Sequence, residues 1–261
     1  MFRALTTAAT GMDAQQTRMD VIANNLANVN TTGFKKDDTH FEDLIYQIIR
    51  TPGGQNQQGT ITPTGLQVGH GTRLAAIFKS FSQGATLQTQ NPMDMAIEGR
   101  GFFRIQLPSG QYAYTRDGTF KTDPNGQVVT SMGEPLDPPL TIPPDTTQVI
   151  ISKSGVVSAY IGQSPNSTEI GRIELSDFPN PGGLENLGHN YLAQTEASGE
   201  PISGYPGDRG IGNLSQGYLE ESNVKVVEEM INLIFSQRAY EVNSKVIQTA
   251  DAMLQKATNI R

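Results

Sequence analysis

VKVVEEMINLIFSQRAYEVNSKVIQTADAMLQKATNI, residues 224–260, carries an apolar side chain at every third or fourth position. This spacing matches the roughly 3.6 residues per turn of an α-helix, and the stretch contains neither glycine nor proline. The pattern predicts a helix about 55 Å long with one apolar stripe. The stripe comprises Val224, Val227, Ile231, Phe235, Ala239, Val242, Val246, Ala250, Met253, Ala257 and Ile260.

A second helical stripe lies near the other end of the chain. Its members follow the 4-3 spacing of a heptad, and Gly33 is placed to end the helix. The longer helix would overhang a central globule about 35–40 Å across, so we expect the two helices to pack on each other and on neighbouring subunits. The N-terminal stripe comprises Leu5, Ala9, Met12, Gln16, Met19, Ala23 and Leu26.

The residues between the two helices show the signals of short β-strands. Phe103, Ile105 and Leu107 alternate with polar residues, and turn dipeptides such as Asp117-Gly118 and Asn125-Gly126 recur. Regular short strands separated by turns indicate a compact antiparallel domain.

We therefore predict an α+β fold, in which long N- and C-terminal helices pair as a coiled-coil-like domain beside a central, mostly antiparallel β-domain. The expected parts are residues 1–33 and 222–261 as the helical assembly domain, 34–71 as an extended connecting segment, and 72–221 as the β-domain.

The composition argues against several classes of function. The chain has 261 residues, 19 Lys and Arg against 26 Asp and Glu, and a formal net charge of −7. An acidic chain lacks the positive surface that attracts nucleic acid or anionic lipid. The absence of cysteine removes disulfides, thiolate metal sites and cysteine nucleophiles. No apolar run approaches the ~18 residues of a membrane span, and no Sec signal peptide is recognisable, so we expect no membrane insertion and export by another route.

No constellation of residues indicates catalysis. His40, His70 and His189 are far apart in the sequence, and no G-x-S-x-G, H-E-x-x-H or Walker A pattern occurs. We therefore predict no enzyme activity, no cofactor and no metal site. Two other classes stay open on the residues alone. One is a secreted binding module built on the β-domain. The absence of Trp and the aromatic content of only 7% argue against it. The other is a hydrolase, for which the sequence shows no site.

The stretch ANNLANVNTTGFK, residues 23–35, resembles the signature of bacterial flagellar rod, hook and hook-associated proteins. IEGRGFF at 97–103 and YTRDGTF at 114–120 are similar to the opening of that family's β-domain. SNV at 222–224 and QRAYEVNSK at 237–245 are similar to its C-terminal helix. The resemblance covers essentially the whole chain.

The resemblance implies a structural subunit that self-assembles into the rigid helical tube of the flagellar distal rod, which crosses the periplasm and transmits torque from motor to hook. Implied partners are other copies of the chain, other rod proteins, the hook protein, the L- and P-ring proteins and the flagellar type III export apparatus. We expect the assembly interface to include Leu5, Met12, Met19, Asn24, Asn25, Leu26, Asn28, Gly33, Phe34, Val227, Ile231, Phe235, Ala239, Val242, Val246, Ala250 and Met253.

Residues 46–71 bear on which member of the family this chain resembles. Composition alone favours a flexible linker, because prolines and several glycines interrupt the segment. It nevertheless resembles a segment typical of the distal rod, where it is implied to lie ordered between subunits and to stiffen the rod relative to the hook. The proximal rod and the hook are the alternatives, and this segment argues against both. Its marker residues are Tyr46, Ile49, Pro52, Pro63, Leu66 and Val68.

Overall fold

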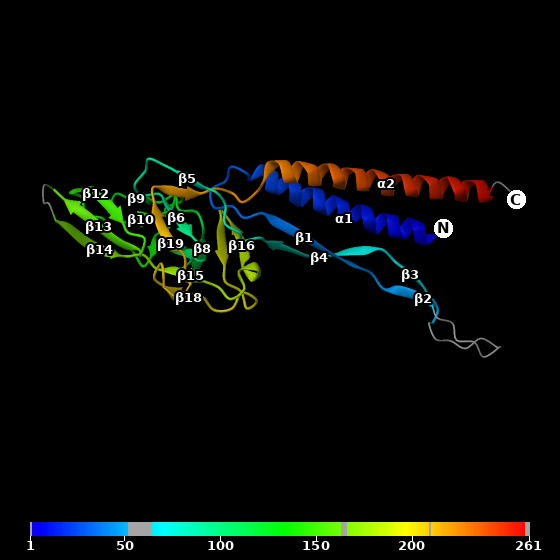
Figure 1. Cartoon of the computed structure of the whole chain (residues 1–261), viewed down its shortest axis with the longest axis horizontal. Helices are drawn as coiled ribbons and strands as arrows, with labels where there is room; N and C mark the ends of the chain where they lie inside the picture. The colour runs from blue at the N-terminus through cyan, green and yellow to red at the C-terminus, as the bar shows by residue number, and fades with distance from the viewer. Residues whose placement is uncertain (1, 52–63, 163–165, 209, 259–261) are drawn as a thin grey trace. The chain divides into compact units, whose positions relative to one another are not determined.

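The structure is a computed structural model that describes residues 2–51, 64–162, 166–208 and 210–258 (Figure 1). The chain forms two compact units, which we describe separately. The predicted α+β fold, with a helix near each end of the chain and a central antiparallel β region, is confirmed. The helical unit comprises Met1–Leu26, Asp37–Phe78 and Lys225–Arg261, and the β-rich unit comprises Ala27–Lys36 and Lys79–Val224.

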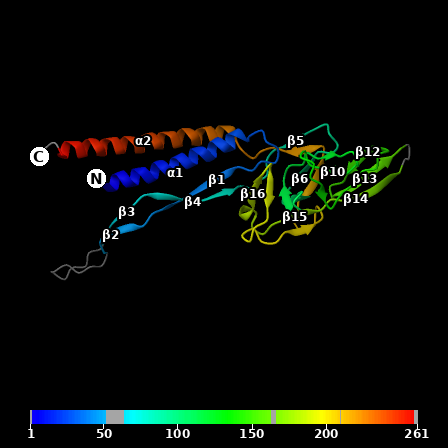
Figure 2. The same ribbon diagram turned by 180° about the vertical axis from the view of Figure 1, so that it is seen from behind.

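Two long helices, α1 (Phe2–Ala27) and α2 (Val226–Thr258), dominate the helical unit. They lie side by side and run in opposite directions, so α1 begins near the place where α2 ends (Figures 1 and 2). A Cβ atom added to Gly11 of α1 would lie 2.9 Å from the side-chain nitrogen of Asn243 in α2. The missing side chain at Gly11 therefore lets the two helices approach closely at this point.

The buried face of α2 differs from the predicted apolar stripe. Glu229, Ser236 and Ala250 are 5%, 1% and 2% exposed, and Asn243, half-buried, occupies the missing step of their seven-residue spacing. Small and polar side chains thus line part of the side of α2 that packs within the chain, beside the half-buried Leu233, Ile247 and Leu254. The small side chains on this face let the two helices lie closer together than large apolar side chains would.

A two-stranded ribbon completes the helical unit. Strand β1 (Asp37–Asp43) pairs with β4 (Thr72–Lys79), and β2 (Tyr46–Arg50) pairs antiparallel with β3 (Leu66–Gly69). The ribbon passes against α1 at Gly71, where an added Cβ atom would overlap the Thr10 hydroxyl oxygen. Pro52 and Pro63 lie outside the described residues.

The largest sheet of the β-rich unit has seven strands in the order β16-β17-β8-β7-β15-β18, with β11 also paired to β7, and each of these pairs is antiparallel. A 3-10 turn, Pro181–Gly183, precedes β16. The strands are β7 (Phe102–Gln106), β8 (Tyr112–Thr115), β11 (Leu136–Asp137), β15 (Leu175–Asp177), β16 (Glu185–Gly188), β17 (Tyr191–Ala193) and β18 (Ile202–Gly204).

Smaller sheets complete the β-rich unit. A three-stranded sheet has the order β12-β13-β14, and three two-stranded pairs join β6 to β19, β5 to β20 and β9 to β10. Their strands are β5 (Thr86–Gln88), β6 (Met95–Glu98), β9 (Lys121–Thr122), β10 (Val128–Val129), β12 (Thr146–Ile151), β13 (Val156–Ile161), β14 (Ser167–Arg172), β19 (Asn213–Gln216) and β20 (Tyr218–Glu220).

Both faces of strand β7 are buried. Phe103 faces the main apolar cluster and packs edge-to-face on Phe120, with 5.1 Å between ring centroids. Phe102 faces a second cluster that contains Tyr114 and Phe178. Because apolar clusters cover both faces of β7, this strand lies in the core of the β-rich unit.

We expect Phe103→Ala to lower the free energy of unfolding of the β-rich unit by about 3–5 kcal/mol, because it leaves a cavity in the main cluster. Ile202→Ala, in the edge strand β18 where the side chain is 49% exposed, is the control and should change stability by less than about 1 kcal/mol. Denaturant unfolding of both variants measures the difference. Equal losses would contradict the placement of the core.

Candidate functional site

The segment that joins α1 to β1, residues 27–36, is held by the β-rich unit. The Gly33 N–H donates to the Glu220 carbonyl at 2.8 Å, and the Asn190 side chain donates to the Thr32 carbonyl at 3.1 Å. The sequence suggests that Gly33 ends the helix, but α1 ends at Ala27. Gly33 instead has a φ of +69°, and an added Cβ atom would lie 2.7 Å from the backbone nitrogen of Asp117. Glycine is therefore needed here by both conformation and space.

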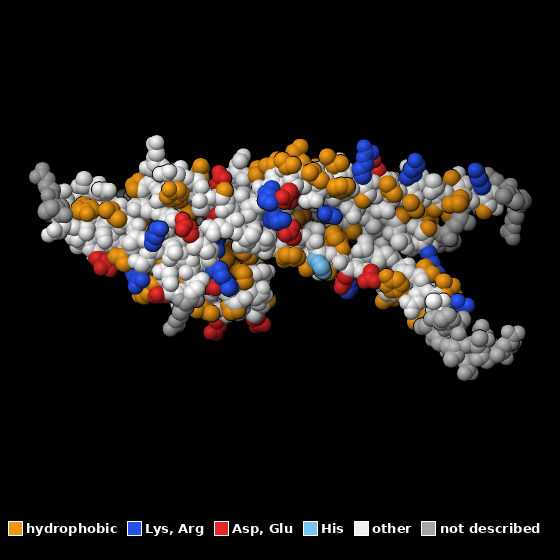
Figure 3. Space-filling model, viewed as in Figure 1, with side chains coloured by type: hydrophobic (Ala, Val, Ile, Leu, Met, Phe, Trp, Pro, Cys, Tyr) orange, Lys and Arg blue, Asp and Glu red, His pale blue; other side chains and the backbone are white. Residues whose placement is uncertain are grey.

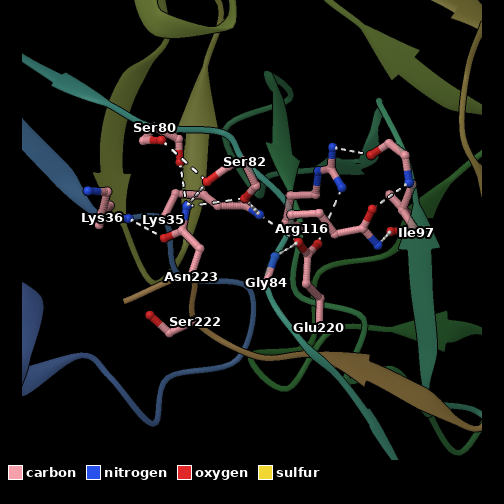
Figure 4. Close-up of polar contacts among 12 residues, drawn as sticks. Lys35, Lys36, Ser80, Ser82, Gly84, Ile97, Arg116, Glu220, Ser222 and Asn223 are labelled. Atoms are coloured by element: carbon pink, nitrogen blue, oxygen red, sulfur yellow. Dashed lines mark hydrogen bonds and ion pairs between the residues drawn. The ribbon is translucent and has the colours of Figure 1, made fainter. Parts of the chain in front are cut away.

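A buried ion cluster anchors this segment (Figure 4). The Lys35 ammonium lies 2.6 Å from Glu220 Oε1, and Arg116 Nη1 lies 3.3 Å from Glu220 Oε2. The side chains of Lys35, Glu220 and Arg116 are 3%, 0% and 5% exposed. One carboxylate therefore pairs with two cations that come from distant parts of the chain.

Further hydrogen bonds hold the cluster, although the buried Arg116 Nε has no hydrogen-bond partner. Lys35 Nζ donates to the Ser82 carbonyl at 2.8 Å, Arg116 Nη2 donates to the Gly99 carbonyl at 2.8 Å, and the Gly84 N–H donates to Glu220 Oε1 at 3.0 Å. Burial lowers the pKa of the Lys35 ammonium and that of the Arg116 guanidinium, and the Glu220 carboxylate opposes both shifts. Glu220 is thus the group that makes the burial of the two cations tolerable.

Asn223 ties together three of the four points at which the chain passes between its two units. Its Oδ1 accepts from the Lys36 N–H at 2.8 Å, and its Nδ2 donates to the Ser80 carbonyl at 2.8 Å (Figure 4). The Ser80 N–H in turn donates to the Lys36 carbonyl at 2.9 Å. Residues next to three of these crossings, at 36, 80 and 223, are therefore bonded to one another within the β-rich unit.

Asn25 closes a matching contact inside the helical unit. Its Nδ2 donates to the Asp37 carbonyl and its Oδ1 accepts from the Asp37 N–H, each at 2.9 Å. The side chain, in a residue only 1% exposed, thus pairs with the backbone of β1 and fixes the end of α1 beside it.

The other N-terminal residues expected at an interface occupy mixed environments. Asn24 is exposed, Asn28 accepts a hydrogen bond from the Thr31 hydroxyl at 3.2 Å, and Phe34 lies under the Lys79 ammonium, 4.8 Å from its ring centroid. The large apolar members of the stripe are half-buried, and these are Leu5, Met12, Met19 and Leu26.

The large apolar side chains of the C-terminal stripe are exposed. Phe235 is 67% exposed, and hydrophobic side chains gather on the visible surface of α2 (Figure 3). Ala239 is half-buried. Ala250 is buried inside the single chain and so differs from the exposed members of the stripe. The exposed members are Val227, Ile231, Phe235, Val242, Val246 and Met253.

The ribbon also exposes apolar side chains. Tyr46, Ile49 and Leu66 are 53%, 54% and 49% exposed, and Val68 is half-buried. Within the described parts of the chain, no group of three or more His, Cys, Asp or Glu side chains could hold a metal ion. No helix in those parts is long and apolar enough to span a membrane.

Sequence reasoning missed the ion cluster, although Lys35 and Arg116 both lie inside stretches that carry the family resemblance. The only local signal was a charged residue set among apolar and turn residues, as in TGFK and YTRDG. Nothing in the sequence links either cation to Glu220, because 185 and 104 residues separate the partners.

Comparison with family sequence models gives three matches along the chain. Residues 5–35 match the model described as flagella basal body rod protein. Residues 96–159 match the flagellar hook protein FlgE/F/G D1 domain, and residues 215–260 match the flagellar basal body rod FlgEFG protein C-terminal. The first match contains Lys35, the second Arg116 and the third Glu220, so the ion cluster joins all three matched regions.

Comparison with individual proteins gives relatives that align over the full chain. A flagellar basal-body rod protein FlgG of Borreliella burgdorferi is 51% identical over 100% of this chain and 99% of its own length. The protein of the same name in Caulobacter vibrioides is 47% identical over 99% of each chain. The flagellar hook-basal body complex protein FlhP of Bacillus subtilis is 32% identical over 100% of each chain.

We expect Gly33→Ala to destabilise the β-rich unit more than Gly110→Ala. Both substitutions place a side chain at positive φ, which costs about 1–2 kcal/mol. Only Gly33→Ala adds a clash with backbone, because no atom lies within 4 Å of the added Cβ atom at Gly110. Thermal unfolding of the two variants should rank them in that order, and the reverse order would contradict the packing at Gly33.

We expect Glu220→Gln to lower the free energy of unfolding by about 3–5 kcal/mol, because two buried cations lose their shared carboxylate. The control is Glu42→Gln, which breaks the exposed pair of Glu42 with Arg73 and should cost at most about 1 kcal/mol. Denaturant unfolding at neutral pH measures both. A loss of stability no larger for Glu220→Gln than for the control would rule out the anchoring role.

Proposed function

We infer that this chain, which belongs to the family of flagellar basal-body rod proteins, is a structural subunit of the flagellar distal rod. In this role it polymerises into a rigid helical tube that transmits torque from the motor to the hook. The chain carries no catalytic step and no cofactor in this proposal. Within the family the alternatives are the proximal rod and the hook.

The exposed apolar surface of α2 carries the proposal. Val227, Phe235 and Val242 are 69%, 67% and 62% exposed in the single chain. Large apolar side chains concentrated on one helix are unfavourable in water, and such surfaces mark sites of protein association. We propose that α1 and α2 form a coiled-coil-like pair whose outer apolar side chains are covered by neighbouring copies, in head-to-tail contacts that do not close into a ring.

Residues 46–71 support a distal-rod subunit in particular. The ribbon formed by β2 and β3 exposes Tyr46, Ile49 and Leu66, and an isolated two-stranded ribbon is only marginally stable in water. We propose that it docks on a neighbouring subunit. Wedged between subunits, it would limit the sliding that lets a hook bend.

Assembly with other flagellar basal-body components follows from family membership. We propose that the specific partners are the other rod proteins, the hook protein and the L- and P-ring proteins that surround the rod. Subunits would cross the periplasm through the flagellar type III export apparatus and the growing channel.

Electron microscopy of the concentrated full-length chain tests the proposal. We expect straight tubes from the wild type and none from Phe235→Ser, which removes an exposed apolar contact from every subunit. Met132→Ser is the matched control, because Met132 is 60% exposed but lies in the β-rich unit, and it should assemble normally. A wild type that stays monomeric at every concentration, or a Phe235→Ser variant that assembles like the control, would refute the role given to α2.

Deletion of residues 46–65 should leave the β-rich unit folded and the polymer curved or flexible. A second variant replaces the same residues with a glycine-serine segment of equal length. It keeps the length of the connection but removes the apolar side chains, so it should also give a curved or flexible polymer. Circular dichroism measures the cooperative unfolding of the β-rich unit, and micrographs measure curvature. A straight polymer from either variant would show that rigidity has another origin, and lost cooperativity would show that the segment belongs to the fold.

A further inference from the structure

The outer face of α1 is acidic and lined by small side chains. Ala9, Asp13, Gln16, Asp20 and Ala23 are all exposed, and their 4-3 spacing places them on one side of the helix. Asp13 lies two positions beyond Gly11, which contacts α2, and two positions turn a helix by about 200°. The acidic side chains therefore point away from α2.

The outer face of α2 is basic toward its C-terminal end. Arg238 and Lys245 are exposed, seven residues apart, and each lies two positions beyond a member of the packed face, Ser236 and Asn243. Figure 3 shows Lys and Arg side chains projecting from α2 beyond its apolar surface. The spacing of the two cations equals the spacing of Asp13 and Asp20.

We propose that the acidic face of α1 docks on the basic face of α2 in a second copy of the chain. This inference rests on the proposed polymer and specifies one of its contacts. The two faces lie on opposite sides of the helix pair, so they cannot meet within one chain. A contact between two different faces of identical subunits is heterologous, and it repeats into a filament unless the rotation closes it.

The side chains around the charges suit such a contact. Ala9 and Ala23 flank the two aspartates and allow close approach, while Ile231 and Ile234 continue the outer face of α2 and are 48% and 56% exposed. Apolar contact would supply the attraction, and the charges would select partner face and register. Arg238 also pairs with Glu241 at 3.1 Å in its own helix, and that exposed pair is weak enough to exchange.

Charge reversal on one face and then on both tests the proposal. Asp13→Lys with Asp20→Lys, and Arg238→Glu with Lys245→Glu, should each raise the critical concentration for polymerisation about tenfold, since two pairs per subunit become repulsive. The variant with all four substitutions should return to within about threefold of the wild type. Lys121→Glu, an exposed reversal in the β-rich unit, is the control and should leave the critical concentration unchanged.

The outcomes separate this inference from the proposed function. A wild type that forms no polymer refutes the proposed function. A wild type that polymerises, with reversed variants that polymerise equally well or a fourfold variant that does not recover, overturns the docking of the two faces. Circular dichroism must show unchanged helix content in each variant, so that misfolding is not counted as an assembly defect.

The absence of cysteine allows an independent measurement. In the double variant Asp20→Cys with Lys245→Cys, a flexible bismaleimide added to assembled protein should give a ladder of trimers and longer oligomers, because each subunit is linked on two sides. Asp20→Cys with Lys121→Cys is the control and should give no ladder. Products limited to dimers, or a ladder in the control only, would overturn the proposal.

Discussion

One buried carboxylate, that of Glu220, is the interaction on which the rest of the structure depends. It binds Lys35, which follows α1, and Arg116, which follows a central strand of the main sheet. Because both cations are buried, neither can replace its contact with the Glu220 carboxylate by hydration once the β-rich unit has formed. The segment leaving α1 is therefore an integral part of that unit, and the chain cannot release it without exposing or unpairing charge.

The second constraint lies in the helices, where packing within the chain and packing between chains use different side chains. Gly11, Ser236 and Ala250 allow α1 and α2 to lie close, although they bury little apolar area. The large apolar side chains, such as Phe235, remain outside. A helix pair built this way leaves large apolar side chains in water, and association with other copies would cover them.

These two constraints differ in how far the sequence predicts them. The existence of both helices follows from long stretches with apolar periodicity and few breakers, and the alternation at Phe103 and Ile105 marks a strand. Periodicity alone did not identify the packed face of α2, because an apolar stripe looks the same whether it meets its own chain or another copy. The pairing of Lys35 with Glu220 was beyond local patterns, since long-range ion pairs leave no trace in spacing.

Residues of the candidate site hold together the segments at which the chain crosses between its units. The chain crosses four times, and hydrogen bonds among Lys36, Ser80 and Asn223 hold three of the crossings together. A single crossing could rotate about a few backbone bonds, whereas three bonded crossings must break several hydrogen bonds at once to move apart. Load applied to one segment is consequently shared with the other two. A subunit that transmits torque requires this property, and it depends on Asn223 staying in place beside the Glu220 cluster.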